Sequence, residues 1–372
     1  MQNMSQKAPA KVLVAMSGGV DSSVAVYLLK QNHYDCMGAM MKLFQNDDIA
    51  GDGENAGIEK SCCSLSDAED ARAAAMRLEV PFYLFNFRDL FQEKVMNRFA
   101  QAYQSGETPN PCIDCNKHLK FEKFLHRAKE LNCDYMATGH YAQIYYDDAA
   151  KRYFLKRGVD ETKDQSYVLY SLTQHQLART LFPLGGLKKE EVREIARACG
   201  FLNAEKRESQ DICFVPDGDY ASFIEDYTGT SSEPGAFIDH DGKVLGTHRG
   251  AIRYTVGQRR GLGIAAPEPL YVCEKRMREN KIVLGKEEML YASALTATNI
   301  NLIPFDRIDQ PIRVLAKTRY RQKAEAATVT QIDSDTIRVE FDKPQRAITA
   351  GQAVVLYDGD WVVGGGTIEG PS

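Results

Sequence analysis

The sequence lacks any apolar run long enough to cross a bilayer, and its opening residues, MQNMSQKAPA, lack the apolar stretch of a secretory signal. It also lacks internal repeats and low-complexity tracts, which excludes repeat proteins and largely disordered chains. Hydrophobic residues make up 44% and charged residues 26% of the chain, as in a soluble globular protein. We therefore expect a cytoplasmic protein with no membrane partner.

An excess of basic charge is also absent, because the formal net charge is −5. Such a balance gives no general affinity for nucleic acid, but binding needs only a local basic surface. Residues 249–261, RGAIRYTVGQRRG, have four cations, and residues 313–323, RVLAKTRYRQK, have five, with no acid in either stretch. Each stretch also carries a tyrosine that could stack on a base. On the residues of either stretch alone, a solvated β surface is the favoured interpretation.

The length of 372 residues is too great for one ordinary core, so we expect two or three domains. The first part alternates strand-length apolar runs with amphipathic helices, which predicts a parallel sheet covered on both faces. The predicted strands are 11–16, 35–44, 82–87 and 134–146. The predicted helices are 24–31, one that starts with a capping box at Ser66 and Glu69, 88–103, 118–131 and 188–200, the last with Gly200 as its C′ residue.

From about residue 216 the pattern changes to short β-rich runs between turn signals, which predicts small antiparallel units. The expected fold class is α/β. It has an N-terminal parallel-sheet domain at 1–215, a small central β-rich domain at 216–285 and a C-terminal antiparallel β-barrel at 286–372. The polar residues 45–64 are expected to form a loop within the first domain.

The strongest local signal is AMSGGVDSS, residues 15–23, between the first strand and the first helix. Gly18 and Gly19 let the backbone turn tightly and approach a ligand. The amides of residues 19–22 would then point outward at the helix N-terminus, where the helix dipole favours a phosphate or pyrophosphate. Asp21 is best explained if Mg²⁺ joins its carboxylate to the phosphates. Hydroxyl donors are added by Ser17, Ser22 and Ser23.

This turn matches neither the P-loop pattern, which needs a lysine before Ser or Thr, nor the G-x-G-x-x-G dinucleotide pattern. It could be an ordinary strand–helix turn with small residues, but its glycines, serines and acid fall at the carboxyl edge of a strand, where open α/β sheets bind ligands. SGGVDSS resembles the PP-loop of the ATP-pyrophosphatase superfamily. The resemblance implies cleavage of ATP between its α- and β-phosphates and transfer of AMP to an oxygen atom. Amidotransferases, argininosuccinate synthetases and tRNA-thiolating enzymes share it.

Nine cysteines are spread over the chain, and in a large cytosolic protein they are normally reduced. They are therefore expected to be core residues, metal ligands or reactive thiols. An adenylated oxygen needs a nucleophile to displace it, and a thiolate is the strongest candidate. Cys115 stands just before a predicted helix, with Lys117 and Lys120 nearby, which would lower its pKa. Cys213 could share the work, one cysteine carrying sulfur as a persulfide and the other resolving the product.

Other interpretations of the cysteines stay open. Cys112 and Cys115 could be half of a zinc site with Cys62 and Cys63, although adjacent cysteines make awkward ligands. An iron–sulfur cluster held by Cys112, Cys115 and Cys213 would leave one iron open for sulfur. The remaining cysteines are expected to be small buried hydrophobic residues, namely Cys36, Cys133, Cys199 and Cys273.

Several motifs together go beyond the PP-loop. In chain order they are TPNP with CNK (108–117), ATGHYA (137–142), KDQSYVLY (163–170), CF (213–214), YTVGQRRGLGI (254–264) and KTRYRQ (317–322). With these motifs along essentially its whole length, the sequence resembles the tRNA-specific 2-thiouridylase family. The resemblance implies that O2 of the tRNA wobble uridine (U34) is replaced by sulfur, with ATP and Mg²⁺ required. His140, within ATGHYA, could then contact a nucleotide or a base, or be structural.

Matched residue by residue, the resemblance implies four groups of site residues. ATP would bind at Ala15, Met16, Ser17, Gly18, Gly19, Val20, Asp21, Ser22, Met41 and Gly139. The target base would face Asn110, Pro111 and Cys112. The nucleophile would be Cys115 and the persulfide carrier Cys213, with a transient disulfide between them. The tRNA would be contacted by Lys163, Asp164, Gln165, Arg319 and Tyr320.

Cys112 departs from the family pattern, because many members have an aspartate there that is proposed to assist proton transfer. The nearest acid in this chain is Asp114. Cys112 could act as an acid/base thiol, as a ligand of the possible iron–sulfur cluster, or as neither. Apart from that cluster, no metal site built from side chains is expected.

The resemblance also implies partners: the anticodon stem-loop of tRNA, and a persulfide donor such as a cysteine desulfurase or a relay carrier. The protein is expected to be a monomer. Two rival functions remain, a PP-loop ligase acting on a small molecule and a non-catalytic tRNA-binding protein. A small-molecule ligase would have little need for the two basic C-terminal stretches.

Overall fold

The computed structural model describes residues 9–44, 65–206 and 212–372. The predicted loop at 45–64, and with it the zinc site that would use Cys62 and Cys63, lies outside the described residues.

The described chain forms two compact units, which we call unit 1 and unit 2. Unit 1 comprises residues 9–44, 65–92, 115–206 and 212–216, and unit 2 comprises residues 93–114 and 217–372. The domain boundaries expected near residues 215 and 285 remain predictions.

Unit 1 is built on a five-stranded parallel sheet with the strand order β3-β2-β1-β4-β7. The side chains of Val12, Leu13 and Val14 in the central strand are 0% exposed, as expected for a strand covered on both faces. The predicted parallel sheet is therefore confirmed. Its strands are β1 (Lys11–Ala15), β2 (Asp35–Lys42), β3 (Phe82–Asn86), β4 (Tyr135–Ala137) and β7 (Thr180–Leu181).

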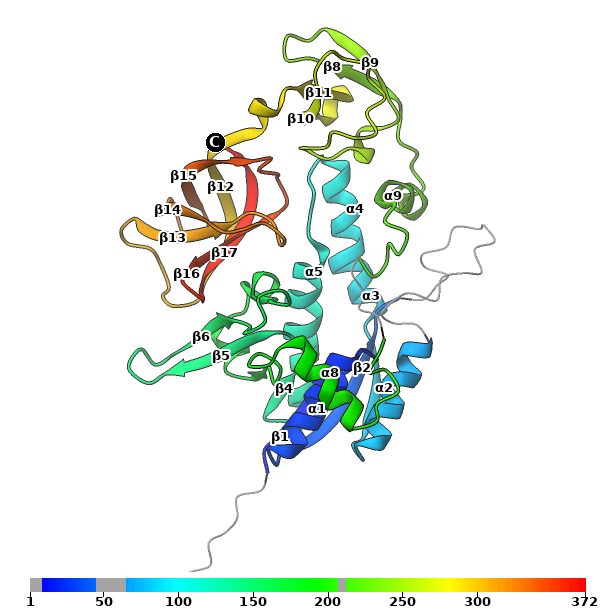
Figure 1. Cartoon of the computed structure of the whole chain (residues 1–372), viewed down its shortest axis with the longest axis vertical. Coiled ribbons are helices and arrows are strands. Elements are labelled where there is room, and N and C mark those ends of the chain that lie inside the picture. Colours follow the sequence, from blue (N-terminus) through cyan, green and yellow to red (C-terminus); the bar gives the residue numbers. More distant parts are fainter. Residues whose placement is uncertain (1–8, 45–64, 207–211) are drawn as a thin grey trace, which may run out of the picture. The chain divides into compact units, whose positions relative to one another are not determined.

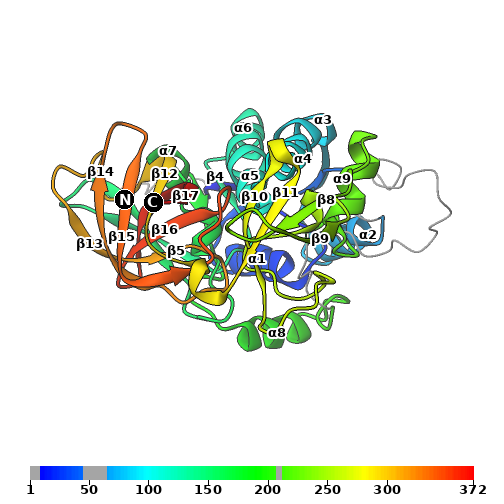
Figure 2. The ribbon, with the colours of Figure 1, turned by 90° about the horizontal axis from the view of Figure 1, so that it is seen from above.

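Helices cover both faces of this sheet, with α1 and α8 on one face and α6 on the other (Figure 2). Val24 of α1, Ala71 of α2 and Val192 of α8 belong to one apolar core. The helical elements of unit 1 are α1 (Val20–Gln31), α2 (Leu65–Arg77), α3 (Arg88–Phe91), the π-helical η3 (Cys115–Phe124), α6 (Leu125–Glu130), the 3₁₀ turn η4 (Ser166–Leu169), α7 (Gln174–Leu177) and α8 (Lys189–Ala198). A second π-helical segment, η2 (Gln92–Met96), runs from the end of unit 1 into unit 2.

The strand order creates a topological switch point between β1 and β4. From β1 the chain passes through α1 to β2 and later to β3, whereas it returns through η3 and α6 to β4 on the other side of β1. Right-handed crossovers then put α1 and α6 on opposite faces of the sheet. Open α/β sheets bind ligands at the carboxyl ends of the strands beside such a point.

Some predicted elements of unit 1 differ from the structure. The predicted strand 134–146 is two strands, β4 and β5 (Ala142–Asp147), and β5 forms an antiparallel hairpin with β6 (Arg152–Arg157). α2 begins one residue before Ser66, so Ser66 lies in its first turn and does not precede it. Gly200, with a φ of 65°, follows the end of α8 as predicted.

Unit 2 contains a small four-stranded sheet with the order β10-β11-β8-β9, whose core includes Phe237, Val272 and Ile282. Its strands are β8 (Gly235–Ile238), β9 (Val244–His248), β10 (Tyr271–Arg276) and β11 (Lys281–Gly285). Its helical elements are α4 (Asn97–Gln104), α5 (Pro111–Asp114), α9 (Tyr220–Thr228) and the 3₁₀ turns η5 (Ala251–Arg253), η6 (Met277–Glu279) and η7 (Glu287–Leu290).

The C-terminal part of unit 2 is a closed antiparallel barrel (Figure 1). Each strand pairs with its neighbours, and pairing of β12 with β17 closes the ring. Leu295, Val329 and Val354 lie in its core. The predicted barrel is confirmed. Its strands are β12 (Tyr291–Leu302), β13 (Ile312–Lys317), β14 (Glu325–Gln331), β15 (Ile337–Arg346), β16 (Ala353–Asp358) and β17 (Trp361–Pro371).

The sequence pattern does not predict α9, β12 or β14. Both strands are rich in Ala, Asn, Gln or Glu, which have weak β preference, so only pairing with neighbours fixes them. The nine-residue helix α9 starts where the Asp219 side chain accepts a hydrogen bond from Ser222 N and ends at Gly229, whose φ is 65°.

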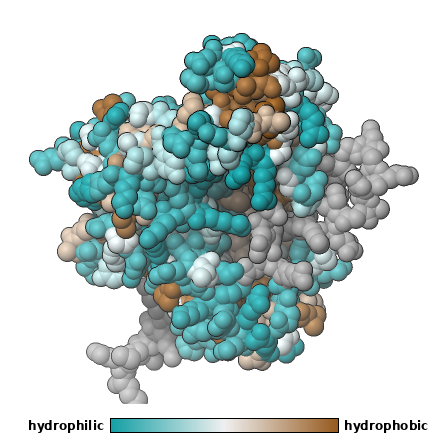
Figure 3. Space-filling view, turned by 45° about the horizontal axis from the view of Figure 1, so that its top comes forward, coloured by the Kyte–Doolittle hydropathy of each residue, from teal (hydrophilic) through white to brown (hydrophobic). Residues whose placement is uncertain are grey.

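The face shown in Figure 3 is mostly hydrophilic, and apolar residues form separate patches on it. None of the helices in the described parts of the chain is both long and apolar enough to cross a membrane.

Replacing Gly364 of β17 with alanine tests how the barrel closes. A Cβ at this position would lie 2.1 Å from the Asn301 carbonyl oxygen, and the φ of 149° is one that side chains rarely adopt. We expect Gly364→Ala to lower the free energy of unfolding by about 2 kcal/mol or more, measured by urea denaturation of the full chain. Gly370→Ala, in the same strand with nothing within 4 Å of its Cβ, should change it by less than about 0.5 kcal/mol. Equal effects would contradict this account of closure.

Candidate functional site

The turn after β1 has the geometry of an anion site. Gly18 has a φ of 76°, and a Cβ there would lie 2.3 Å from the Asp67 carbonyl oxygen, so this position requires glycine. Gly19 is the N-cap of α1, and no side chain caps this helix end. The first amides of α1 can therefore donate to a ligand, and the helix dipole favours an anion there.

Side chains from within the turn and from outside it hold this backbone in place. Ser22 Oγ accepts from Ser17 N at 3.2 Å and donates to Gly19 O at 3.0 Å. Asn203, which is 4% exposed, donates to Gly18 O at 2.9 Å and to Ser23 Oγ at 3.2 Å. The sequence analysis missed Asn203, since nothing near it in the sequence marks it as a partner of the turn.

The loop after β4 meets this turn. A Cβ on Gly139 would lie 2.9 Å from Asp21 C and from Ser22 N, so only glycine lets the two backbones approach this closely. This contact also explains why the predicted strand 134–146 is broken into two. Met41 lies near the carboxyl end of β2, whose Ala39 accepts from Met16 N at 2.8 Å. All residues expected to hold ATP are thus gathered at one edge of the sheet.

Asp21 has a different set of partners from the one expected. Its carboxylate accepts from Lys189 Nζ at 2.7 and 2.8 Å, and from the Tyr141 hydroxyl at 2.8 Å. The Lys189 side chain is 9% exposed, so a nearly buried ammonium stands beside the amide-lined turn. The sequence analysis missed Lys189. The available signal was the position of Lys189 in the first turn of α8. A cation is unfavourable there because of the helix dipole, unless a nearby anion offsets that interaction.

These contacts do not fit Mg²⁺ held by Asp21. Both carboxylate oxygens are already engaged with Lys189, and a hard cation needs several free oxygen ligands. Among the described residues, no group of three or more His, Cys, Asp or Glu side chains could hold a metal ion. The iron–sulfur cluster considered for Cys112, Cys115 and Cys213 is therefore not supported.

The segment that begins at Lys163 holds the site's loops in place. Gln165 Oε1 accepts from Tyr141 N at 3.0 Å, and the backbone N of Gln165 donates to Tyr141 O at 3.0 Å. Asp164 accepts from Gly158 N and Ser166 N, each at 3.1 Å. Gln165, expected to contact tRNA, therefore also fixes the position of Tyr141, which in turn donates to Asp21.

Cys115 lies inside a helical run, and the expectation that it stands just before a helix is wrong. The run begins at Pro111, with Asn110 as its cap, because Asn110 Oδ1 accepts from Cys112 N at 3.2 Å. Cys112, which is exposed, is the thiol in the first helical turn, so the helix dipole acts mainly on Cys112 and not on Cys115. Cys115 is partly buried and opens the π-helix η3, a geometry often found at functional sites.

Cys115 and Cys213 both belong to segments that contact α3. The helix η3 packs on α3, and it leads through α6 into β4, so its N-terminal end, with Cys115, lies toward the carboxyl edge of the sheet. Phe214, next to Cys213, is 1% exposed and meets the ring of Phe91 in α3 with centroids 5.6 Å apart. Buried packing therefore anchors the chain beside Cys213, which is itself partly buried.

Of the four cysteines expected to be buried, Cys36 is buried, whereas Cys133, Cys199 and Cys273 are only partly buried. Burial raises the pKa of Cys36 to about 11. Burial also raises the pKa of Cys133 to about 11 and raises those of Cys199 and Cys273. These thiols are poorly suited to nucleophilic work, because the thiolate is the reactive form.

The other predicted contact residues belong to unit 2. Asn110, Pro111 and Cys112 follow a loop tied to the barrel, since Thr108 N donates to Ala350 O at 2.9 Å. Arg319 donates to Ala347 O at 3.0 Å and to Thr349 Oγ1 at 2.8 Å. The Tyr320 side chain is 36% exposed, and the Lys317 ammonium lies 5.6 Å from its ring centroid.

His140 has the environment of a structural histidine. It is 7% exposed, and its Nδ1 lies 2.7 Å from Thr138 Oγ1. The rings of Phe121 and Phe182 are 5.8 and 5.9 Å away, centroid to centroid. Burial, with a smaller effect from Lys120, holds its pKa well below the ordinary value, so the ring is neutral.

Replacing Asn203 with aspartate tests whether its amide shapes the turn. The new carboxylate keeps the size of the side chain but cannot donate to Gly18 O. We expect Asn203→Asp to weaken ATP binding about 10-fold or more and to lower stability by about 1–3 kcal/mol, measured by calorimetric titration and urea denaturation. Asn32→Asp is the control, because exposed Asn32 also donates to a backbone carbonyl of α1, Leu28 O, at 2.8 Å but lies at the other end of the helix. Unchanged ATP affinity in Asn203→Asp would contradict the role given to Asn203.

Comparison with protein families matches three consecutive regions of the chain. The tRNA methyl transferase HUP domain matches residues 10–217, the tRNA methyl transferase PRC-barrel domain residues 221–286, and the aminomethyltransferase beta-barrel domain residues 292–368. Among solved structures, that of NMN synthetase from Francisella tularensis matches 62% of this chain and 82% of its own, with 17% identity and a TM-score of 0.34, which is too low to support an argument.

Curated relatives match almost the entire chain. The tRNA-specific 2-thiouridylase MnmA of Clostridioides difficile is 50% identical over 96% of this chain and 98% of its own. The proteins of the same name from Acetivibrio thermocellus and Clostridium acetobutylicum are 49% and 48% identical, each over 96% of this chain and 99% of its own. Because this identity extends over almost the whole of each chain, this chain belongs to the tRNA-specific 2-thiouridylase family.

Proposed function

We propose that the protein is an ATP-dependent tRNA sulfurtransferase that converts the wobble uridine of the anticodon to 2-thiouridine. The observation that carries the proposal is that the amide-lined turn, the loop after β4 and Lys189 meet at the carboxyl edge of the sheet. The N-terminal end of η3, with Cys115, lies toward the same edge. An anion site suited to a nucleotide and a candidate nucleophile thus belong to the same unit.

In the first step, uridine O2 attacks the α-phosphorus of ATP. The bond between the α-phosphorus and the bridging oxygen breaks, pyrophosphate leaves, and the N3 proton of the uridine is lost. The amides at the start of α1 and the Lys189 ammonium would stabilise the negative charge that develops on the transferring phosphate. The base is then an adenylated imidate, with AMP as a good leaving group on C2.

In the second step, sulfur replaces that oxygen. The terminal sulfur of a persulfide on Cys213 attacks C2, the C2–O2 bond breaks, and AMP leaves with the oxygen. The Cys115 thiolate then attacks Cys213 Sγ, which releases the new C2–S group and forms a Cys115–Cys213 disulfide. In a second route, Cys115 first frees the sulfur as hydrosulfide, which attacks C2 itself. Both routes consume two electrons from the thiols, so a cellular thiol must reduce the disulfide before the next turnover.

ATP is proposed as the activating substrate, held by Ala15–Ser22, Met41 and Gly139. When bound with ATP, Mg²⁺ would neutralise phosphate charge. Since Lys189 already engages Asp21, we assign no step to a metal held by that carboxylate.

The uridine is proposed to face Asn110, Pro111 and Cys112, which start a helix at the end of a loop fixed to the barrel. An unstacked base in an RNA loop costs little to extrude into such a site. Cys112 is exposed in the first helical turn, which supports an acid/base role for its thiol.

Contacts to the tRNA backbone are proposed for Lys163, Arg319 and Tyr320. For Asp164 and Gln165, whose side chains bond to the backbone of their own unit, we propose an indirect contribution through the loops they hold. The two basic stretches at 249–261 and 313–323 would supply affinity for tRNA that falls as the salt concentration rises.

The sulfur donor is proposed to be a persulfide protein such as a cysteine desulfurase or a relay carrier. The working form of this chain is proposed to be a cytoplasmic monomer.

A methyl transferase, as the names of two matched domain families suggest, is the less favoured function. The turn after β1 suits phosphates, and methyl transfer needs neither phosphate cleavage nor a second cysteine.

One measurement distinguishes the proposed tRNA sulfurtransferase from the rival ligase that would act on a small molecule. Release of pyrophosphate that depends on added tRNA supports the sulfurtransferase, and release that does not need tRNA excludes the sulfurtransferase.

Replacing Cys115 or Cys213 with serine tests the sulfur-transfer step. We expect either variant to lose 2-thiouridine formation, because serine can neither carry nor resolve a persulfide. Both should keep tRNA binding and tRNA-dependent pyrophosphate release, because adenylation does not need these thiols. Mass analysis of tRNA nucleosides and a pyrophosphate assay read the two steps separately.

The matched control is Cys199→Ser, since burial raises the pKa of that thiol and the mechanism does not use it. It should retain thiolation. If Cys115→Ser or Cys213→Ser forms as much 2-thiouridine as Cys199→Ser does, the two-cysteine mechanism is wrong.

Replacing Lys189 with alanine tests the adenylation step. We expect the rate of tRNA-dependent pyrophosphate release to fall by about 10²–10³-fold, as when one charge-stabilising donor is removed from a transition state. Lys188→Ala, an exposed neighbour in the sequence, should leave the rate within about twofold. Equal rates for the two variants, measured at saturating ATP, would remove Lys189 from the mechanism.

A further inference from the structure

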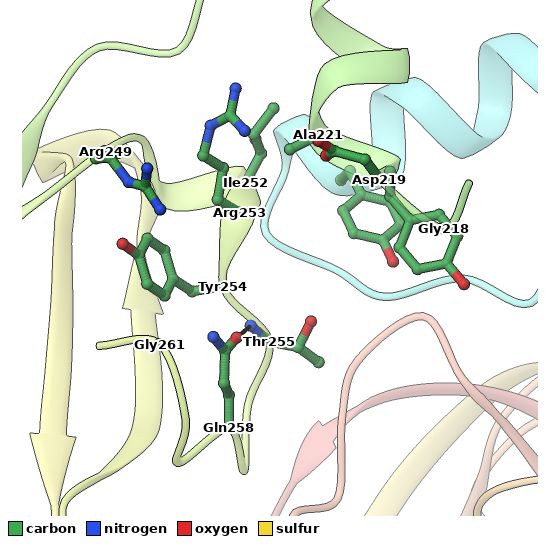
Figure 4. A pocket seen from close by; sticks show the side chains of 12 residues that line it. Gly218, Asp219, Ala221, Arg249, Ile252, Arg253, Tyr254, Thr255, Gln258 and Gly261 are labelled. Carbon is green, nitrogen blue, oxygen red and sulfur yellow. Dashed lines mark hydrogen bonds between the residues drawn. The ribbon is translucent and has the colours of Figure 1, made fainter. Parts of the chain in front are cut away.

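A cavity of about 290 Å³ lies within unit 2, between the start of α9 and residues 249–261 (Figure 4). Arg249, Arg253 and Tyr254 lie on one side of it, and Asp219 lies on the other. Tyr103 of α4 and Tyr220 of α9 also line it. The residues that line this cavity are all different from those proposed to bind ATP, the target base or the sulfur.

The aromatic walls of the cavity are held rigidly. Tyr103 and Tyr220 lie with ring centroids 6.1 Å apart and planes at 33°. Tyr254 packs edge-on against Phe237, with centroids 5.2 Å apart, and Tyr103 and Tyr254 are each only 5% exposed. Burial raises the pKa of Tyr103, so its hydroxyl stays neutral. Rings that are fixed in advance lose little freedom when a flat ligand stacks on them.

The charged side chains that line the cavity are Arg249, Arg253 and Asp219. Arg253 is paired with Glu225. The Asp219 carboxylate is engaged by Ser222, accepting from its N at 3.0 Å and from its Oγ at 2.7 Å. Arg249 is exposed and makes no ion pair within the described parts of the chain. A guanidinium placed in this way can take a phosphate through two parallel hydrogen bonds.

A second cation lies behind the aromatic wall. The Lys275 ammonium is 5.9 Å from the Tyr103 ring centroid. Its Nζ is buried, and no described residue gives it a hydrogen-bond partner. Burial lowers its pKa to about 8, so most of it is charged at neutral pH. A buried cation without a partner is unfavourable, and an anionic ligand in the adjoining cavity would offset part of that cost.

Gln258 could be taken as a reader of base edges, but its side chain is already engaged. Its Oε1 accepts from Thr255 N at 3.0 Å, and its Nε2 donates to Arg260 O at 2.9 Å. Gln258 therefore holds the loop in shape, and the cavity offers stacking and charge more than a pattern of base-reading groups. The volume lies near the lower end of ligand sites, roughly 300–1,000 Å³, which suits one nucleotide and not a helix of RNA.

We propose that this cavity binds one unstacked nucleotide of the tRNA, distinct from the uridine that is thiolated. The base stacks on the partly exposed ring of Tyr220, and its phosphate contacts Arg249. Because stacking tolerates any base, the site anchors the tRNA without selecting a base at that position. The inference rests on the proposed function, since it assumes that tRNA is the substrate.

The test measures tRNA binding by the full chain at several salt concentrations. Arg249→Ala is expected to weaken binding about 5- to 20-fold and to reduce the slope of log affinity against log salt by about 1. The control is Arg278→Ala, because Arg278 is also exposed in unit 2 but does not line the cavity. Affinity for ATP, measured in the same preparations, should be unchanged in both variants.

A crosslinking experiment on the unaltered protein supplies an independent measurement. Ultraviolet irradiation of the complex with tRNA should yield peptides crosslinked at Tyr220 or Tyr254, and uridine monophosphate alone should yield them only at much higher concentration.

The measurements distinguish failure of the proposed function from failure of the second nucleotide site. If the unaltered protein neither binds nor thiolates tRNA, the proposed function fails. If it does both, but Arg249→Ala behaves like Arg278→Ala and no crosslink forms at the cavity, only the second nucleotide site is overturned. Tight binding of free uridine monophosphate without an effect of Arg249→Ala on tRNA binding would identify a small-molecule site and also overturn it.

Discussion

The contact between the Asp21 carboxylate and the Lys189 ammonium joins the segments on which the candidate site depends. Asp21 belongs to the first turn of α1, Lys189 begins α8, and Tyr141, which also donates to Asp21, belongs to the loop after β4. Gln165 holds Tyr141 in turn. Because the lysine is nearly buried, its charge needs this carboxylate in the absence of ligand. A phosphate arriving at the α1 amides would compete with Asp21 for the same cation, so the site is prepared for an anion.

This arrangement divides the proposed reaction between two kinds of chemistry. The fixed amides and the Lys189 ammonium would stabilise the charge that develops when AMP is transferred to uridine O2. The thiols would supply the sulfur that replaces this oxygen. The cysteines differ in environment accordingly. Burial raises the pKa of Cys36, Cys133, Cys199 and Cys273, which lowers the fraction of reactive thiolate at these positions. Cys115 and Cys213 lie instead in segments that pack on α3, one in a π-helix and the other beside the anchored Phe214. The division explains why one chain carries both a nucleotide turn and reactive cysteines.

Local signals in the sequence predicted much of the fold, and long-range pairing explains what they missed. The turn at Gly18 and Gly19, the parallel sheet and the barrel follow from short patterns of apolar, glycine and polar residues. Lys189 and Asp21 are 168 positions apart, so no local pattern could join them. The strands β12 and β14 depend on their neighbours, because their own residues favour strands weakly. The start of the Cys115 helix could have been predicted, since Asn110 and Pro111 form a common cap and first turn, and that signal was overlooked.

The central claim is that uridine O2 is activated by transfer of AMP at the turn after β1. The most direct measurement uses tRNA labelled with ¹⁸O at O2 of the wobble uridine, together with ATP and a persulfide donor. If O2 attacks the α-phosphorus, the label must leave the base on AMP, in an amount equal to the 2-thiouridine formed, with unlabelled pyrophosphate. Label found in inorganic phosphate or in water, with unlabelled AMP, would contradict the account.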